Sequence, residues 1–457
     1  MSLLFFRYER LARCLHLCGC ERSAAEYCMK GLELYPDHAM MKETLKVIQR
    51  TVNDGQKGTA TEPQAGFDVE LGIDKYPDQG MVRRECYPWN TFEPDRCSEE
   101  SLAFLNAEMQ KVAPKLEVRA TELPSLANGS GGELSTVKQL GVFAKENVGP
   151  GKIVLEETSL LTANNRLQDA LCDACSADLP ELSDPSFADV VACPECSVVF
   201  CNQKCLDLAT EQYHPAVCDR GVEDIAKNVP PSEAANTLYS LLLLRTLAMA
   251  ETQDCHPLDL SYVKFIWGDY HTTDIFEAWD SSSSPRDTMA QYPRTLPFSF
   301  QANVVLPFNM LEMMDIDIFA NPQYDVWVFN TLFAKFRGTA SARLSGLGGR
   351  PIRGPEVSAV HPMWCLANHS CDPNVTWRWA SEVRFQVLNE RVQWRNPKDG
   401  RVTKSRPGLK KDEEVMSHYC DIDLPVAQRR EWAAGSLGGA CCCNRCIWEA
   451  EHDDNKG

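Results

Sequence analysis

The strongest constraint on this chain is the spacing of its cysteines. Two Cys-x2-Cys pairs, Cys172–Cys175 and Cys193–Cys196, are followed by Cys201, Cys205, His214 and Cys218. Each pair can place two thiolates on one tetrahedral ion at about 2.3 Å. Eight ligands in this register favour metal binding over unrelated free thiols. They predict two closed zinc sites, which are structural because neither keeps an open coordination position.

The other cysteines support the same chemistry. The chain has 21 cysteines, and a second group of them, Cys441, Cys443 and Cys446, lies near its end. We expect no secretory signal, because the apolar start at 1–6 is followed at once by Arg7. Cysteine-rich chains that are not secreted use thiols for metals more than for disulfides. The expected location is the nucleus and/or the cytoplasm.

Composition limits the partners. The 457 residues are 44% apolar and carry a net charge of −18, which is enough for a large core and more than one domain. This charge argues against direct nucleic-acid binding, and against a DNA-binding zinc protein, but is compatible with a basic protein substrate. No 18-residue apolar run predicts a membrane span. We expect a monomer.

Two polar segments carry residues suited to a ligand site. Asn368 and His369 offer amide and imidazole groups that could hold a polar cofactor, and Cys371 is a soft metal ligand. The second segment, 412–419, ends in Tyr419. Taken singly, each residue is as well explained by a turn, a core histidine or a core aromatic.

The run Asn-His-Ser-Cys-Asp-Pro-Asn at 368–374 resembles the signature of SET-domain protein lysine methyltransferases. The eight-ligand pattern is similar to the MYND finger of the SET-and-MYND-finger (SMYD-like) subfamily. The resemblance implies an α+β fold, in which SET-domain β-sheets with a pseudoknot are split by a MYND zinc finger and a helical insert. It covers roughly residues 132–450.

The resemblance also assigns ligands to three expected Zn²⁺ ions. MYND ligands interleave, so one ion takes Cys172, Cys175, Cys201 and Cys205, and the other takes Cys193, Cys196, His214 and Cys218. The third ion takes Cys371 together with the tail cysteines Cys441, Cys443 and Cys446. Four thiolates complete a tetrahedral site of this kind.

An S-adenosylmethionine site follows from the same likeness. Tyr419 is the implied catalytic residue, and the implied cofactor-binding residues are Asn368, His369, Lys138, Gly141 and Asn330, the last on a strand expected at 326–333. Two departures are visible. Gln139 stands where the family has the first glycine of a Gly-x-Gly loop, and Gly439, not an aromatic residue, lies just before the tail cysteines.

The predicted organisation has seven parts. They are a helical segment at 1–52, a linker and irregular segment at 53–131, the SET N-terminal part at 132–171, the finger at 172–218, the helical insert at 219–320, the SET core at 321–430 and the cysteine cluster at 431–457. The first part resembles a tetratricopeptide repeat, and a plain helical hairpin explains it equally well. Apolar periodicity further predicts a helix at 233–251, a strand-turn-strand at 137–157, a hairpin at 375–388 and a basic loop at 391–411.

Two functions are compatible with these features. The first is an S-adenosylmethionine-dependent protein lysine methyltransferase acting on histone or other protein lysines. The alternative is a non-catalytic adaptor that binds proline-rich or other protein partners through the finger and the N-terminal helices. Gln139 and Gly439 favour the adaptor, whereas the Asn368–His369 pair and Tyr419 favour the enzyme.

Overall fold

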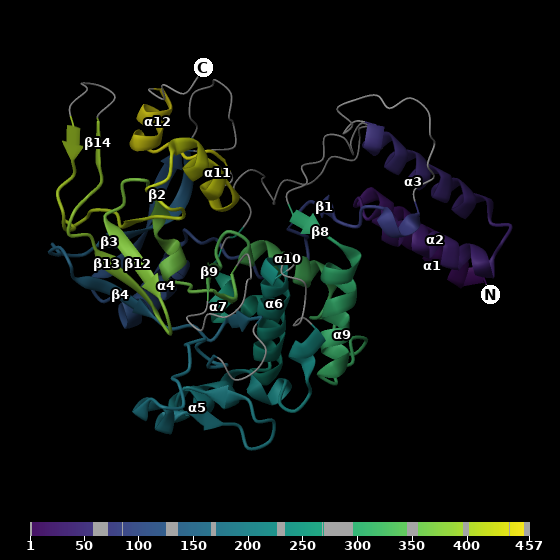
Figure 1. The fold of residues 1–457 in the computed structure, drawn as a ribbon, viewed down its shortest axis with the longest axis horizontal. Helices are drawn as coiled ribbons and strands as arrows, with labels where there is room; N and C mark the ends of the chain where they lie inside the picture. The colour runs from purple at the N-terminus through teal and green to yellow at the C-terminus, as the bar shows by residue number, and fades with distance from the viewer. Residues whose placement is uncertain are drawn as a thin grey trace. The chain divides into compact units, whose positions relative to one another are not determined.

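The computed structural model describes residues 2–57, 72–84, 86–124, 136–165, 171–225, 234–266, 268, 296–344, 355–395, 402–437 and 439–451 (Figure 1). Helices and strands are both abundant, as the α+β prediction requires. The chain forms two compact units, one of Met1–Arg84 with Trp279–Asn309 and one of Glu85–Ala278 with Met310–Gly457.

The first unit begins with three helices, α1 (Ser2–Leu17), α2 (Glu21–Leu34) and α3 (Ala39–Lys57), which confirms the helical segment. Gly19 ends the first helix with a φ of +82°, a left-handed conformation that glycine adopts without a steric penalty. The third helix continues to Lys57, beyond the predicted start of the linker at residue 53. Whether the helices form a tetratricopeptide repeat stays a prediction.

A short sheet completes this unit. Strand β1 (Gly80–Val82) pairs antiparallel with β8 (Leu296–Phe298), and a π-helical turn (Gln301–Val305) follows. Phe298 packs in one core with residues of the N-terminal helices, among them Ala25. Residues 296–305 therefore lie outside the helical insert expected at 219–320, because strand pairing and apolar burial tie them to the N-terminal helices.

The second unit contains most of the strands among the described residues. Strands β2 (Leu116–Pro124) and β3 (Thr136–Ala144) pair antiparallel. A second sheet has the order β12 (Val375–Trp379), β13 (Val383–Val387), β4 (Ile153–Glu157). The strand-turn-strand prediction near 137–157 and the hairpin prediction at 375–388 are confirmed.

Helices cover these sheets. Ser98 caps α4 (Glu99–Val112), which packs on β2 through Leu105 and Met109. A three-stranded sheet of β5 (Thr162–Asn164), β10 (Val357–Ala359) and β9 (Ser341–Arg343) contacts α6 (Ala234–Thr252), the helix predicted at 233–251. The shorter elements are η1 (Ile73–Lys75), η4 (Val222–Ile225), η5 (Pro257–Asp259), α7 (Ser261–Lys264), α9 (Leu306–Met313) and η7 (Trp364–Leu366).

The strand predicted at 326–333 is wrong. Val326–Phe336 is the helix α10, capped by the Asp325 side chain, so Asn330 lies on a helix. The apolar residues alternate only in part, and the buried ones also recur at helical spacing, since Val328, Phe329, Leu332, Phe333 and Phe336 are all buried. Burial of that helical face decided between the two periods.

The expected basic loop at 391–411 is partly a hairpin. Strands β14 (Gln393–Arg395) and β15 (Val402–Lys404) pair antiparallel. Asp372 anchors this hairpin by accepting hydrogen bonds from Arg391 (3.2 Å), Trp394 (3.1 Å) and Ser405 (2.9 Å). The tail forms α11 (Val426–Leu437) and α12 (Asn444–Glu451).

Candidate metal centres and active site

The eight predicted ligands of the finger form two groups, each with its ligand atoms within 4.8 Å of one another. One group is Cys172, Cys175, Cys201 and Cys205, and the other is Cys193, Cys196, His214 and Cys218. The two groups interleave along the chain, as the resemblance implied.

Sulfur separations in these groups fit a tetrahedral ion. Cys175 and Cys201 lie 3.8 Å apart, as do Cys193 and Cys218. Zn–S bonds of about 2.3 Å at tetrahedral angles place neighbouring sulfurs about 3.8 Å apart. A disulfide would need about 2.05 Å, and all these cysteines are free. Both ligand sets therefore fit zinc.

Local backbone geometry shapes both groups in the same way. Ser176 and Ser197 follow the two Cys-x2-Cys pairs with φ of 57° and 64°, and their N–H groups donate to the Cys172 and Cys193 carbonyls at 2.9 and 3.0 Å. The finger adds β6 (Val191–Ala192), β7 (Val199–Phe200), α5 (Gln203–Gln212), η2 (Pro185–Asp189) and η3 (His214–Ala216). The Asn202 side chain caps α5 and thereby positions Cys205, whose N–H donates to it.

The third group joins distant segments. Cys371 lies with Cys441, Cys443 and Cys446, and the sulfurs of Cys371 and Cys446 are 3.3 Å apart although the residues are 75 positions apart. Three guanidinium groups hold the tail in place. Arg445 donates to the Cys371 carbonyl (2.8 Å), Arg430 to the Cys441 carbonyl (3.1 Å) and Arg429 to the Cys446 sulfur (3.6 Å). Arg429 and Arg445 also pair with Glu449, so one carboxylate fixes two of these guanidinium groups.

Sequence reasoning missed Cys420. Its sulfur lies within 4.8 Å of the Cys371 sulfur and of a His369 ring nitrogen, and its side chain is 3% exposed. Its position directly after Tyr419 was the available signal, since any contact between the two polar segments would bring it toward Cys371.

The two polar segments meet as neighbouring strands. Strand β11 (Asn368–His369) pairs parallel with β16 (Met416–Ser417), and the Ser370 N–H donates to the Ser417 carbonyl at 2.8 Å. Asn374 reinforces the contact, because its amide donates to the Glu414 carbonyl and accepts from the Met416 N–H, both at 2.8 Å.

Tyr419 is held at both ends. Its N–H donates to Nδ1 of His369 at 3.0 Å, and its hydroxyl donates to the Ala367 carbonyl at 2.8 Å. Nδ1 is thus an acceptor, so Nε2 carries the proton and faces the Cys371 sulfur at 3.4 Å. Burial raises the pKa of Tyr419 above its usual 10 and lowers that of His369 to about 4, so both are neutral near pH 7.

Asn368 and Gly141 meet at the Glu414 side chain. The Asn368 amide donates to the Leu140 carbonyl (3.0 Å) and to Oε1 of Glu414 (2.7 Å). A Cβ on Gly141 would lie 2.6 Å from the same oxygen. Burial raises the pKa of Glu414, and the Asn368 hydrogen bond partly offsets this. Lys138 is exposed, earlier on the same strand β3.

Glu157 holds the turn that precedes Asn368. It accepts the N–H groups of Met363 (3.0 Å) and Trp364 (2.8 Å), and thereby caps the 3-10 turn that leads to Asn368. Burial raises the pKa of this carboxyl to about 7, although both hydrogen bonds act against the shift. No sequence pattern distinguished Glu157 from the neighbouring Glu156.

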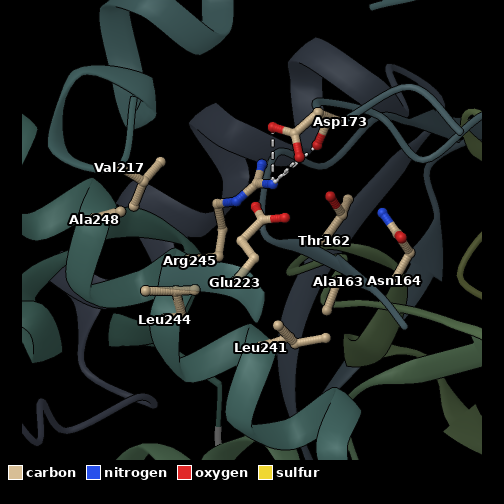
Figure 2. A pocket seen from close by; sticks show the side chains of 10 residues that line it. All are labelled: Thr162, Ala163, Asn164, Asp173, Val217, Glu223, Leu241, Leu244, Arg245 and Ala248. Atoms are coloured by element: carbon tan, nitrogen blue, oxygen red, sulfur yellow. Dashed lines mark hydrogen bonds and ion pairs between the residues drawn. The ribbon is translucent and has the colours of Figure 1, made fainter. Parts of the chain in front are cut away.

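A small pocket lies between α6, β5 and the finger (Figure 2). Arg245 and Asp173 point toward each other there and form an ion pair at 3.1 Å. The Tyr213 hydroxyl donates to Asp173 at 2.6 Å, and the Arg245 guanidinium lies 3.6 Å from the Tyr213 ring centre. Because Asp173 lies inside the first Cys-x2-Cys pair, this network ties the finger to α6. None of the predicted cofactor residues lines the pocket.

No family model matches the sequence, and no curated protein matches it. Among solved structures, the chain is similar to the SET domain of LSMT bound to lysine and AdoHcy, with 13% sequence identity and a TM-score of 0.31. The alignment covers 76% of this chain and 58% of that one. A TM-score of this size does not establish a shared fold.

Within the described residues, no helix is long and apolar enough to cross a membrane.

Proposed function

We propose that this protein is an S-adenosylmethionine-dependent protein lysine methyltransferase. The observation that carries the proposal is the attachment of Tyr419 to His369 and Ala367 where β11 and β16 pair. Three groups that the proposed function needs lie there: a neutral tyrosine hydroxyl, an Asn-His pair, and a cysteine cluster that joins the C-terminal segment to Cys371.

The groups around this pairing suit a polar, cationic cofactor. Ser417 is buried, and within the described residues its hydroxyl oxygen has no hydrogen-bond partner, so it can bind a ligand. The Glu414 carboxylate and the Asn368 amide, which bond to each other at 2.7 Å, come from the same paired segments. These three residues, with Gly141, would hold S-adenosylmethionine, which supplies an electrophilic methyl group when it is bound.

The chain's own residues would then position the acceptor. A lysine ε-amine must lose its proton, from a solution pKa of about 10.4, before it can attack. Apolar surroundings and a neighbouring cation both disfavour the ammonium form, so no strong base is required. The neutral Tyr419 hydroxyl, fixed by Ala367, would orient the amine, and catalysis would come mainly from in-line positioning.

The three cysteine-rich groups are proposed as structural zinc sites. Each offers four soft ligands and no open position, which is the pattern of sites that stabilise a fold. We also keep as proposals a histone or another basic protein as substrate, a proline-rich peptide at the finger, a monomeric state, and a nuclear and/or cytoplasmic location.

The adaptor is the second candidate, and one contact favours it. The Glu414 carboxylate occupies the space at Gly141 where the resemblance implied a close approach of backbone to cofactor. Both ring nitrogens of His369 are also engaged within the protein. An adaptor would use the finger and the N-terminal helices without needing a cofactor.

Titration calorimetry with S-adenosylmethionine separates the two candidates. We expect saturable binding by the zinc-loaded protein, followed by methyl incorporation into a panel of lysine-containing peptides and nucleosomes. The same peptides with lysine replaced by arginine serve as the control that methylation occurs on lysine. Absence of binding at high ligand excess would exclude the methyltransferase and leave the adaptor.

A further inference from the structure

We infer that Cys420 is a peroxide-sensitive thiol that forms a disulfide with Cys371 and thereby releases the zinc of the tail cluster. The tail cluster here means Cys371, Cys441, Cys443 and Cys446. The inference rests on the zinc assignment made under the proposed function, and it adds a modification site that the proposed reaction does not use.

The first observation is that five thiols share one buried cluster. Cys371 belongs to two groups of ligand atoms within 4.8 Å, one with the three tail cysteines and one with His369 and Cys420. A tetrahedral zinc ion with four thiolates has no place for a fifth. Cys420 is therefore a free thiol directly beside a ligand.

The second observation concerns His369, which forms a group of possible metal ligands with Cys371 and Cys420. Its Nδ1 accepts the Tyr419 N–H, so its Nε2 keeps a proton. A ring in this state cannot also bind a metal ion through Nε2, because both nitrogens would then act as acceptors. The group that contains Cys420 is thus not a second zinc site while Tyr419 stays in place.

The third observation is that the two sulfurs can meet. They lie within 4.8 Å, and a disulfide needs about 2.05 Å. Cys371 and Cys420 both lie in bends just outside the paired strands β11 and β16, so a closing movement breaks no strand pairing.

The oxidant is hydrogen peroxide, and the step balances. The Cys420 thiolate attacks one peroxide oxygen and becomes a sulfenic acid, while the other oxygen leaves as hydroxide. The Cys371 sulfur then attacks the sulfenic sulfur, the S–S bond forms, and a second hydroxide leaves. Both cysteines are oxidised by one equivalent each and the peroxide is reduced to two waters once protons are returned. Zinc loses the Cys371 ligand, and with it one of the links between the core and the tail.

The consequence reaches Tyr419, the residue next to Cys420. Withdrawal of Cys371 removes the partner of His369 Nε2, and the new bond pulls on the bend that carries Tyr419. Oxidation would therefore disturb both hydrogen bonds that hold Tyr419. Reduction by a thiol in the presence of zinc would restore them.

The test uses the full-length, zinc-loaded protein and hydrogen peroxide. A chromogenic chelator follows zinc release, and peptide mapping after alkylation of free thiols identifies the disulfide. We expect release together with a Cys371–Cys420 linked peptide, and Cys420→Ser to slow release by about tenfold. Cys442→Ser is the matched control, since Cys442 lies between the ligands but belongs to none of the ligand groups.

Other results would overturn the inference. If Cys420→Ser loses zinc as fast as the unchanged protein, or if the disulfide joins another pair of cysteines, the inference is wrong. A lower resting zinc content in Cys420→Ser would make Cys420 a ligand. An unchanged resting zinc content in Cys443→Ser would instead contradict the zinc assignment itself. Methyl transfer is measured separately, so failure of the inference and failure of the proposed function are distinguishable.

Discussion

The backbone N–H of Tyr419 donates to the Nδ1 atom of His369 across 3.0 Å, although the two residues are 50 positions apart. This bond fixes the histidine tautomer and directs the Nε2 proton to the Cys371 sulfur, 3.4 Å away. The proposed catalytic residue is thereby connected, through one imidazole ring, to the proposed tail zinc site. A change at either end should reach the other.

Replacing Tyr419 with Phe removes the hydroxyl that donates to Ala367 and leaves the ring. We expect a stability loss of about 1 kcal/mol, the usual worth of one such bond. Methyl transfer should fall by at least about tenfold, because positioning of the amine is lost. Calorimetry should show little change in cofactor affinity. Tyr324→Phe, which removes the hydroxyl bond to Glu251 instead, is the control and should retain activity.

Replacing Gly141 with Ala places a Cβ 2.6 Å from Oε1 of Glu414. The carboxylate must move, so its hydrogen bond from Asn368 weakens. We expect a loss of about 1–3 kcal/mol in thermal or denaturant unfolding, as in other overpacked sites, and weaker cofactor binding. Gly149→Ala is the control because nothing lies within 4 Å of its added Cβ. Equal effects of the two changes would contradict the role of Glu414.

Paired cysteine substitutions test the interleaved zinc ligands. Removing Cys175 and Cys201 together should cost one zinc ion, since both belong to one group. Removing Cys175 and Cys196 together should cost two, since they belong to different groups. Native mass spectrometry counts the ions. Sequential pairing along the chain would give the opposite result.

Glu157 makes stability depend on pH. Its pKa is raised from 4.5 to about 7 by burial, so folding favours the protonated form. The stabilisation is complete below pH 4.5 and is lost as pH rises to about 7, with a slope of at most about 1.4 kcal/mol per unit. Glu157→Gln should lack this component. Both proteins lose zinc alike at low pH, so the difference between their unfolding free energies isolates the Glu157 contribution. A difference that does not change with pH would refute the prediction.

Arg245→Ala should destabilise the finger, because it leaves the buried Asp173 carboxylate without its ion pair. Breaking a buried pair from one side costs about 3–5 kcal/mol. The Cys172 site should also lose zinc to a chelator more readily, since Asp173 lies between its ligands. Arg384→Ala removes exposed pairs with Glu156 and Glu382, each worth about 1 kcal/mol or less, and serves as the control. Similar melting curves for both variants would show that the network does not hold the finger.

Local patterns in the sequence were enough for several elements. The helices at 1–52 and 233–251 and the hairpin at 375–388 follow from apolar periodicity, which reflects which face of an element is buried. The pattern at 326–333 failed because its apolar residues fit two periods, and only the neighbours of α10 decide which face is covered. Strand β8 could not be assigned to the N-terminal unit for the same reason: its partner β1 lies far away in the chain.

The sequence by itself determined the local Cys-x2-Cys pairs, because such short spacings already bring two sulfurs within reach of one ion. The grouping of those pairs with distant ligands was only what the family resemblance implied. The sequence also determined that 368–374 and 412–419 are chemically unusual segments. Only the tertiary structure decided that Glu414 covers Gly141, that Glu157 supports Trp364, and that Cys420 joins Cys371. Those contacts depend on packing between distant strands, where burial and hydrogen bonding select one arrangement that local spacing leaves open.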